Sequence, residues 1–211
     1  MSLPHLIFDF GGVLFNWRPA QLLAQVLPEL AGSPERAEHW KAAFFQGYGG
    51  DWGDFDSGLI DSTELVRRIA LRTGLAPAQV QAVVDAVPGE LQPQAGMVEL
   101  LQRARSAGHR LFFLSNMPAP YAEHLEQAYP LADWFEDGVF SSRVRCGKPA
   151  AAIFEIALAR FGIEAAQALF IDDHPVNVEA ALALGLPALL FSSPAQLVLD
   201  LKLRGLVLQA I

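Results

Sequence analysis

Short apolar runs alternate with helical patterns at the start of the chain and throughout its second half. The runs at 6–8, 110–115 and 168–172 have the length and composition of strands buried on both faces of a parallel sheet. Shorter strands are predicted at 138–141 and 187–191, and helices at 97–107, 118–128, 150–161, 175–184 and from Pro194 onward. Alternation of this kind predicts a doubly wound α/β fold with a parallel sheet.

Residues 16–92 show a different pattern, with helices and loops only. Helices are predicted at 19–27, at 34–45 with Ser33 as N-cap, from Asp61 or Ser62, and at 77–87, where Pro88-Gly89 ends the last of them. The glycine- and aspartate-rich stretch 46–61 is predicted to be a loop. The sequence therefore predicts a core domain of residues 1–15 and 93–211 and an inserted helical domain of residues 16–92.

Composition narrows the class of protein. The 211 residues are 52% hydrophobic and carry a net charge of −8, which argues against nucleic acid or an anionic membrane surface as a partner. The single cysteine, Cys146, fits a reducing compartment. Since the sequence shows neither a signal-peptide pattern nor a run of membrane-spanning length, we expect a soluble cytoplasmic protein.

Polar residues end three of the predicted strands: Asp9, Ser115-Asn116 and Asp172-Asp173. Each could simply cap a turn or helix, but the carboxyl ends of parallel strands share one edge of the sheet, where α/β proteins bind ligands. Facing carboxylates repel one another unless a cation lies between them, and oxygen ligands suit Mg²⁺. No histidine and cysteine set has zinc spacing.

Four short motifs occur in a meaningful order: FDFGGVL with Asp9, LSN with Ser115 and Asn116, GKP with Lys148, and FIDDHPVN with Asp172 and Asp173. Together they resemble the haloacid dehalogenase superfamily over nearly the whole chain. The resemblance is strongest to the branch with a helical cap inserted after the first strand. That branch includes bacterial glucose-1-phosphate phosphatases and the N-terminal phosphatase domain of soluble epoxide hydrolase.

The resemblance implies a role for each matching residue. Asp9 would attack phosphorus and form an aspartyl-phosphate. Mg²⁺ would bind Asp9, the Gly11 carbonyl and Asp173, with Asp172 supporting that set. Ser115 and the Asn116 backbone N–H would hold the phosphate oxygens, and Lys148 would stabilise their charge; taken alone, Lys148 could equally be a solvated surface lysine.

Gly11 departs from the pattern, because many phosphatases of this superfamily carry an aspartate there as general acid and base. Its absence favours substrates with better leaving groups, or proton transfer through water or His174. Two alternatives stay open: a haloacid dehalogenase, which on this fold usually has an aromatic residue at that position and lacks the double aspartate, and a binding or regulatory protein of low activity.

The segment FDSGLID resembles the cap loop of this branch, which makes Trp52, Phe55 and Asp56 candidates for contact with the leaving group. An aromatic ring beside a carboxylate suits a sugar phosphate, with a nucleotide or another small phosphomonoester as runner-up. The aromatic rings could equally pack the cap helices. Phe15, Asn16 and Trp17 are expected to line the entry. The expected partner is a small phosphorylated metabolite, and the sequence leaves the oligomeric state open.

Overall fold

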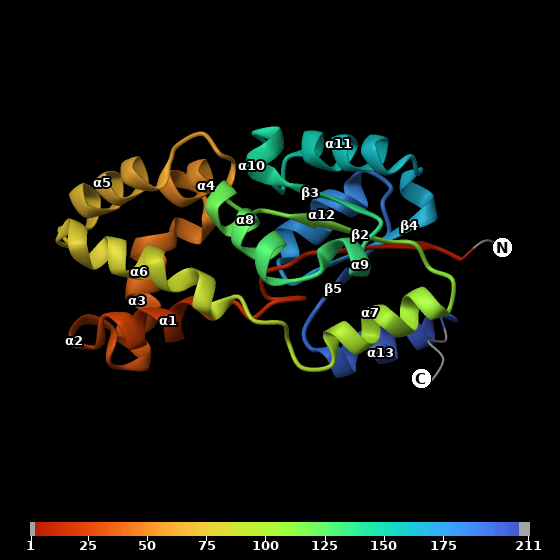
Figure 1. Cartoon of the computed structure of the whole chain (residues 1–211), viewed down its shortest axis with the longest axis horizontal. Coiled ribbons are helices and arrows are strands. Elements are labelled where there is room, and N and C mark those ends of the chain that lie inside the picture. The colour runs from red at the N-terminus through yellow and green to blue at the C-terminus, as the bar shows by residue number, and fades with distance from the viewer. Residues whose placement is uncertain (1–2, 207–211) are drawn as a thin grey trace.

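The computed structural model describes residues 3–206 and contains a parallel sheet with α-helices on both faces (Figure 1). Its five strands have the order β3-β2-β1-β4-β5. Their bounds are β1 His5–Phe8, β2 Leu111–Ser115, β3 Asp137–Phe140, β4 Ala168–Asp172 and β5 Ala188–Leu190. The predicted doubly wound parallel sheet is therefore confirmed, with strand ends within a few residues of those expected.

Side chains of the central strand alternate between two buried layers, as the pleat of a strand requires. Leu6 and Phe8 belong to a cluster that includes α7 (Met97–Ser106) and α13 (Pro194–Leu203), whereas Ile7 belongs to a cluster with α11 (Ala151–Phe161) and α12 (Pro175–Ala183). Figure 1 shows α7 and α13 below the sheet and α11 above it. Because both faces are covered, the strands read as continuous apolar runs.

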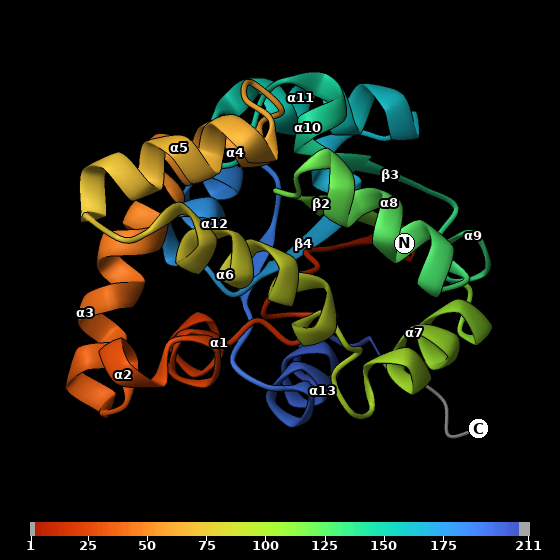
Figure 2. The ribbon, with the colours of Figure 1, turned by 60° about the vertical axis from the view of Figure 1, so that its left-hand side comes forward.

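Six helices follow β1 and gather on one side of the sheet, at the left of Figure 1 and the front left of Figure 2. They are α1 Pro19–Val26, α2 Pro28–Ala31, α3 Pro34–Phe45, α4 Gly50–Asp56, α5 Ser62–Thr73 and α6 Pro77–Glu90. The side chains of Ser33 and Asp61 accept hydrogen bonds from backbone N–H groups three residues later, so both are N-caps.

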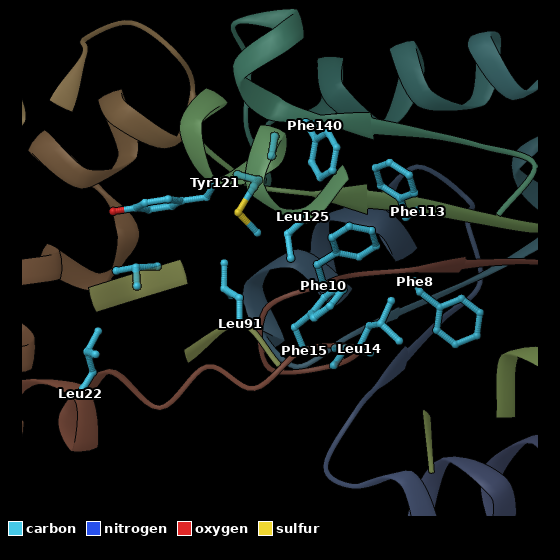
Figure 3. Close-up of a cluster of buried hydrophobic side chains, with 14 of the residues drawn as sticks. Phe8, Phe10, Leu14, Phe15, Leu22, Leu91, Phe113, Tyr121, Leu125 and Phe140 are labelled. Atoms are coloured by element: carbon cyan, nitrogen blue, oxygen red, sulfur yellow. The ribbon is translucent and has the colours of Figure 1, made fainter. Parts of the chain in front are cut away.

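The chain enters and leaves these helices through two adjacent segments. The Asn16 N–H donates to the Gln92 carbonyl (2.8 Å), and the Arg18 guanidinium forms an ion pair with Glu90 (2.7 Å). Figure 3 shows Phe10, Phe113 and Phe140 clustered beside the sheet, with Tyr121 pointing away from them toward the helices. These residues and Leu22 of α1 share one buried cluster, so the apolar core runs without a break from the sheet into the helices.

The prediction of a loop over 46–61 is wrong for the first part of that stretch. A 3₁₀ turn at Gln46–Tyr48 and the helix α4 (Gly50–Asp56) occupy it. Two glycines in seven residues argue against a helix on propensity alone. Tertiary contacts outweigh that cost: Trp52 and Phe55 are buried on the inner face, and Asp51 and Asp54 on the outer face pair with arginines of α5.

The predicted end of a helix at Pro88-Gly89 is also wrong, because α6 continues through Pro88 to Glu90. Proline has no N–H to donate to the carbonyl four residues earlier, which here is that of Val84. The Tyr121 hydroxyl of α8 (Ala119–Ala128) donates to that carbonyl instead (2.9 Å). A neighbouring element thus satisfies the acceptor that the proline leaves open.

Three further short turns complete the chain: α9 Leu131–Trp134, α10 Ser141–Val144 and a 3₁₀ turn at Ala165–Gln167. The sequence predicts a loop over 142–149, and α10 occupies its first residues. Within residues 3–206, none of the helices combines the length and the apolar character that crossing a membrane requires.

Candidate active site

The carboxylates predicted from the sequence meet at the switch point of the sheet. From β1 the chain continues to β2 on one side, whereas β4, on the other side of β1, continues to β5. Asp9 directly follows β1, and Asp172 is the last residue of β4. The Asp9 N–H donates to the Ile171 carbonyl (2.9 Å), which fixes the two strand ends side by side. Open α/β sheets bind their ligands at this position.

Lys148 joins the two strand ends. Its Nζ lies 2.8 Å from Asp9 Oδ1 and 2.6 Å from Asp172 Oδ2, and its side chain is 1% exposed. Burial disfavours the charge of the lysine, but the carboxylates of Asp172 and Asp9 outweigh that effect and raise the pKa of Lys148 above its ordinary value. Lys148 is therefore a buried ammonium group within the site rather than a solvated surface lysine.

Asp172 is fully buried and has a partner for each oxygen. Its Oδ1 accepts hydrogen bonds from the His174 N–H (2.8 Å) and from Asn177 Nδ2 (3.0 Å), while Oδ2 accepts from Lys148. A carboxylate saturated in this way holds Lys148 and the turn after β4 in place. Asp172 therefore contacts the rest of the site through Lys148 and through the turn after β4.

Asn116 positions Lys148 from the other side. Its amide nitrogen donates to the Lys148 carbonyl (2.9 Å), and its amide oxygen accepts from the Lys148 N–H (2.7 Å). Ser115 is 1% exposed, and its hydroxyl lies 3.5 Å from the Asn116 carbonyl oxygen. Asn116 lines the cavity described below, whereas Ser115 lies beneath its wall.

The charges of this cluster do not balance. Burial, together with the charges of Asp172 and Asp173, raises the pKa of Asp9 to about 8, although Lys148 offsets part of the effect. Asp173, unlike its two acidic neighbours, is exposed. Three carboxylates around one ammonium group leave excess negative charge, and a cation would hold Asp9 in its ionised form.

The donor set fits a hard divalent cation. Ligand atoms of Asp9, Asp172 and Asp173 all lie within 4.8 Å of one another, the one such group among the residues that the structure describes. Gly12 has a φ of +82°, and a Cβ there would clash with the Asp173 carboxylate. The turn after β1 therefore requires a glycine at this position. Carboxylate oxygens at the mouth of a cavity are ligands of the kind that Mg²⁺ prefers.

A cavity of about 340 Å³ opens over Asp9. The segments at the strand ends contribute predicted site residues to its wall, and the helical segment 16–92 contributes aromatic and acidic residues. Among the lining residues are Asp9, Gly11, Asn116, Lys148, Asp173, His174, Asn177, Trp17, Tyr48 and Asp56. The structure therefore brings most of the predicted site residues to one cavity.

A smaller recess of about 50 Å³ adjoins this cavity on the helical side. Trp52, Val87, Leu91, Met117 and Tyr121 contribute to its largely apolar wall. Trp52 is 3% exposed and packs against other rings, with its centroid 4.5 Å from that of Phe45.

Not every aromatic candidate reaches the site. Phe55 is buried between Trp52 and Tyr121, and Phe15 packs against Phe10 and Tyr129, so both belong to the apolar core rather than to the cavity wall. Asn16 lies in the linker, hydrogen-bonded to Gln92, whereas Trp17 lines both the cavity and the recess.

Two residues that the sequence did not single out are part of the site. The Tyr48 hydroxyl accepts a hydrogen bond from Trp17 Nε1 (3.1 Å), and its ring lies edge-on to His174 (6.1 Å). Ser141 accepts from the Met117 N–H (2.8 Å) and donates to the Asp56 carbonyl (2.5 Å). Neither belongs to the four motifs named from the sequence: Ser141 directly follows β3, and the run GYGG around Tyr48 resembles an ordinary turn.

The fold and this cluster define a class of α/β enzymes with carboxylates at the switch point of a parallel sheet and a helical cover above it. A model of the haloacid dehalogenase-like hydrolase family matches residues 3–185. The chain belongs to this family, and it is a hydrolase.

Relatives and solved structures agree with this assignment. The chain is 30% identical over 184 residues to the sesquiterpene phosphatase astK of Aspergillus oryzae, covering 87% of each chain. It is 26% identical to flavin mononucleotide hydrolase 1 of Arabidopsis thaliana over 74% of this chain and 62% of the relative. A HAD family enzyme of Bacteroides thetaiotaomicron, solved in complex with magnesium and inorganic phosphate, has the same fold (TM-score 0.70, 22% identity, covering 93% of this chain and 99% of that one).

Proposed function

We propose that this protein is a Mg²⁺-dependent phosphatase that hydrolyses a small phosphomonoester through an aspartyl-phosphate on Asp9. The observation that carries the proposal is the buried Lys148, placed between Asp9 and Asp172 with Asp173 at the cavity mouth. A buried ammonium group beside a nucleophilic carboxylate can bind a phosphoryl group and stabilise the charge on its oxygens.

The residues of the strand-end motifs have the following roles in this proposal. Asp9 attacks phosphorus, and Lys148 orients Asp9 and pairs with a phosphoryl oxygen. The Asn116 N–H and Ser115 bind further phosphoryl oxygens, which requires a small rearrangement of the Ser115 hydroxyl. Asp9, the Gly11 carbonyl and Asp173 would hold the metal, and Asp172 would support them. A bound Mg²⁺ would supply positive charge that neutralises the phosphoryl group and keeps Asp9 ionised.

We also propose that residues 16–92 act as a cap domain over a core domain of residues 1–15 and 93–211. The paired linkers at Asn16–Gln92 and Arg18–Glu90 support this division, since the chain crosses between the two parts there. Trp17, Tyr48 and Asp56 face the cavity from the cap side. A cap of this kind excludes water and contacts the leaving group.

The leaving group is the finer part of the proposal. Tryptophan and tyrosine rings beside the Asp56 carboxyl group support a sugar phosphate, because a ring can stack on one face of a sugar while a carboxyl group binds its hydroxyls. The apolar recess favours a second candidate, a phosphate ester of an apolar alcohol, in keeping with the name of the relative from Aspergillus oryzae.

Partners and compartment follow from the sequence. We propose a cytoplasmic enzyme that acts on a small phosphorylated metabolite and binds neither nucleic acid nor membranes, on the basis of the single cysteine and the net charge of −8. Immunofluorescence of the tagged chain in its native cell tests the compartment, and a signal outside the cytoplasm contradicts it.

Phosphate release from a panel of sugar phosphates, nucleotides, prenyl phosphates and para-nitrophenyl phosphate tests the function. We expect turnover with Mg²⁺ and a loss to background when a chelator removes the metal, restored by added Mg²⁺. Chloride release from a short 2-chloroalkanoate that persists in chelator would instead indicate a dehalogenase. No turnover on either panel would indicate a binding or regulatory protein.

A further inference from the structure

The cavity over Asp9 and the apolar recess share a stretch of wall. The residues that line both are Gly11, Trp17, Tyr48, Asp56 and Asn116. If the phosphoryl group binds beside Asp9 and Lys148 and the leaving group enters the recess, the bridging ester oxygen passes this shared wall. A side chain that donates a proton to the departing oxygen therefore has to belong to this shared wall.

Two side chains in the shared wall carry an acidic proton. Tyr48 is a poor donor, because burial raises the pKa of its hydroxyl above the ordinary value. The Asn116 amide is engaged by the backbone of Lys148. Asp56 is then the acid best suited to the position.

The surroundings of Asp56 favour the protonated form of its carboxyl group. The residue is 6% exposed, and no ion pair neutralises it within the described part of the chain. Burial, together with the charge of nearby Asp9, raises the pKa of Asp56 well above its ordinary value, and the charge of Lys148 offsets this only in part. Tyr48 and Tyr121 are the further titratable groups nearby, and a charge on Asp56 would raise the pKa of both hydroxyls.

Ser141 fixes Asp56 against the core. Its hydroxyl donates to the Asp56 carbonyl and accepts from the Met117 N–H, in the segment that follows Ser115 and Asn116. Ser141 is fully buried. The end of α4 is thereby tied to the proposed phosphate-binding segment, which positions the carboxyl group over the site.

We propose that Asp56 is the general acid and base of the reaction, supplied by the helical part of the molecule because Gly11 has no side chain to do so. This inference rests on the proposed phosphatase function. An Asp9 oxygen forms a bond to phosphorus while the bond from phosphorus to the bridging oxygen breaks. The electron pair of that bond stays on the leaving oxygen, which takes the proton of Asp56 and departs as an alcohol.

The second half of the reaction returns the proton. The Asp56 carboxylate accepts a proton from a water molecule whose oxygen bonds to the phosphorus of the aspartyl-phosphate. The bond between phosphorus and the Asp9 oxygen breaks, and its electron pair returns to Asp9. Inorganic phosphate leaves, and Asp56 is protonated again.

The test compares leaving groups in wild type and Asp56→Asn. The measured quantity is kcat/KM, which includes leaving-group departure but not the later hydrolysis of the aspartyl-phosphate. For an alkyl phosphate we expect kcat/KM to fall by about 10²–10³-fold, because an alkoxide needs a proton to depart. For 2,4-dinitrophenyl phosphate, whose leaving group needs none, we expect a fall of less than about threefold.

Two further variants serve as controls for Asp56→Asn. Asp54→Asn changes a surface carboxylate of the same helix that pairs with Arg68, and it should leave both substrates unaffected. Tyr48→Phe removes the other acidic proton of the shared wall and should show no dependence on the leaving group. If Asp56→Asn does not fold, Asp56→Ala supports the same comparison, because no ion pair is lost.

Equal losses of kcat/KM on both substrates, or no loss on either, overturn the assignment of Asp56. A leaving-group dependence found in Tyr48→Phe rather than in Asp56→Asn overturns it as well. Wild type that releases phosphate from neither substrate contradicts the phosphatase function itself, so the two failures are distinguishable.

Discussion

The two sides of the cavity are built differently. On the sheet side, the buried charged groups have fixed partners: Lys148 bridges two carboxylates, and Asp172 accepts from His174 and Asn177 as well. On the helical side the wall consists mainly of aromatic and aliphatic side chains and one buried acid, Asp56, whose carboxyl group has no ion pair among the described residues. The sheet side can hold a charged group in one geometry. The helical side provides an apolar surface of defined shape and one acidic proton, that of the Asp56 carboxyl group.

This difference indicates a division of labour. Phosphoryl chemistry demands fixed charges that need little reorganisation, which hydrogen-bonded residues at strand ends provide. Recognition of a leaving group demands a wall that can vary without disturbing those charges, which an inserted helical region provides. Changes on the sheet side should therefore affect every substrate alike, and changes on the helical side should depend on the leaving group.

Asp9→Asn is expected to have the largest effect. It removes the nucleophile while keeping the shape of the side chain, so phosphate release should fall by on the order of 10⁴-fold or more for every substrate. The surface variant Asp200→Asn in α13 is the matched control. A residual rate within tenfold of wild type, which is about 1.4 kcal/mol in barrier height, would remove Asp9 from its proposed role.

Lys148→Met tests the sheet side of the cavity through both stability and activity. It leaves Asp9 and Asp172 buried without their cation, so we expect the free energy of unfolding to drop by about 3–5 kcal/mol. Turnover should fall by about 10²–10³-fold on all substrates. Urea unfolding beside Lys202→Met, an exposed lysine of α13, measures the first effect; equal midpoints for the two variants would contradict it.

Tyr121→Phe tests the contact between α8 and α6. Removing the hydroxyl leaves the buried Val84 carbonyl without a donor, at a cost of about 1–2 kcal/mol in unfolding free energy. Pro88→Ala in the Tyr121→Phe background restores a helical N–H and should recover part of that loss. The control is Tyr129→Phe, whose hydroxyl bonds the Leu91 carbonyl nearer the surface. Absence of recovery in the double variant would argue against the account of Pro88.

Glu64 gives the smallest expected effect, on the outer surface of α5. Hydrogen bonds from Arg67 and Arg68 lower the pKa of Glu64 from 4.5 to about 2. Its contribution to stability is therefore present above pH 4.5 and disappears as the pH falls toward 2. Thermal unfolding of wild type and Glu64→Gln should differ slightly at pH 7 and converge at about pH 2; a difference that grows on acidification would contradict this.

The sequence was most informative where local pattern and tertiary position coincide. Asp9 and Asp172 end apolar runs, and parallel strands bring their carboxyl ends together, so the sheet side of the site could be predicted. The positions of the strands along the chain and the interruption after β1 were equally visible, because hydrophobic periodicity changes there.

The helical side could be predicted only in part. Asp56 belongs to a recognisable motif, but Trp52 and Phe55 from the same segment serve mainly as core, which only their packing reveals. Helix α4 was not predicted, because its two glycines have low helix propensity. The helix depends on ion pairs with the arginines of α5, which the local sequence does not reveal. Tyr48 and Ser141 act through contacts with residues distant in sequence, which no local signal records.

The most direct test of the account is to trap the covalent intermediate. Wild type is mixed with 2,4-dinitrophenyl phosphate and Mg²⁺, quenched in acid during turnover, digested, and analysed by mass spectrometry. The account predicts a phosphoryl group on the peptide that contains Asp9, localised to that residue and absent from Asp9→Asn. Turnover that yields a phosphoryl group on another residue would contradict the central claim.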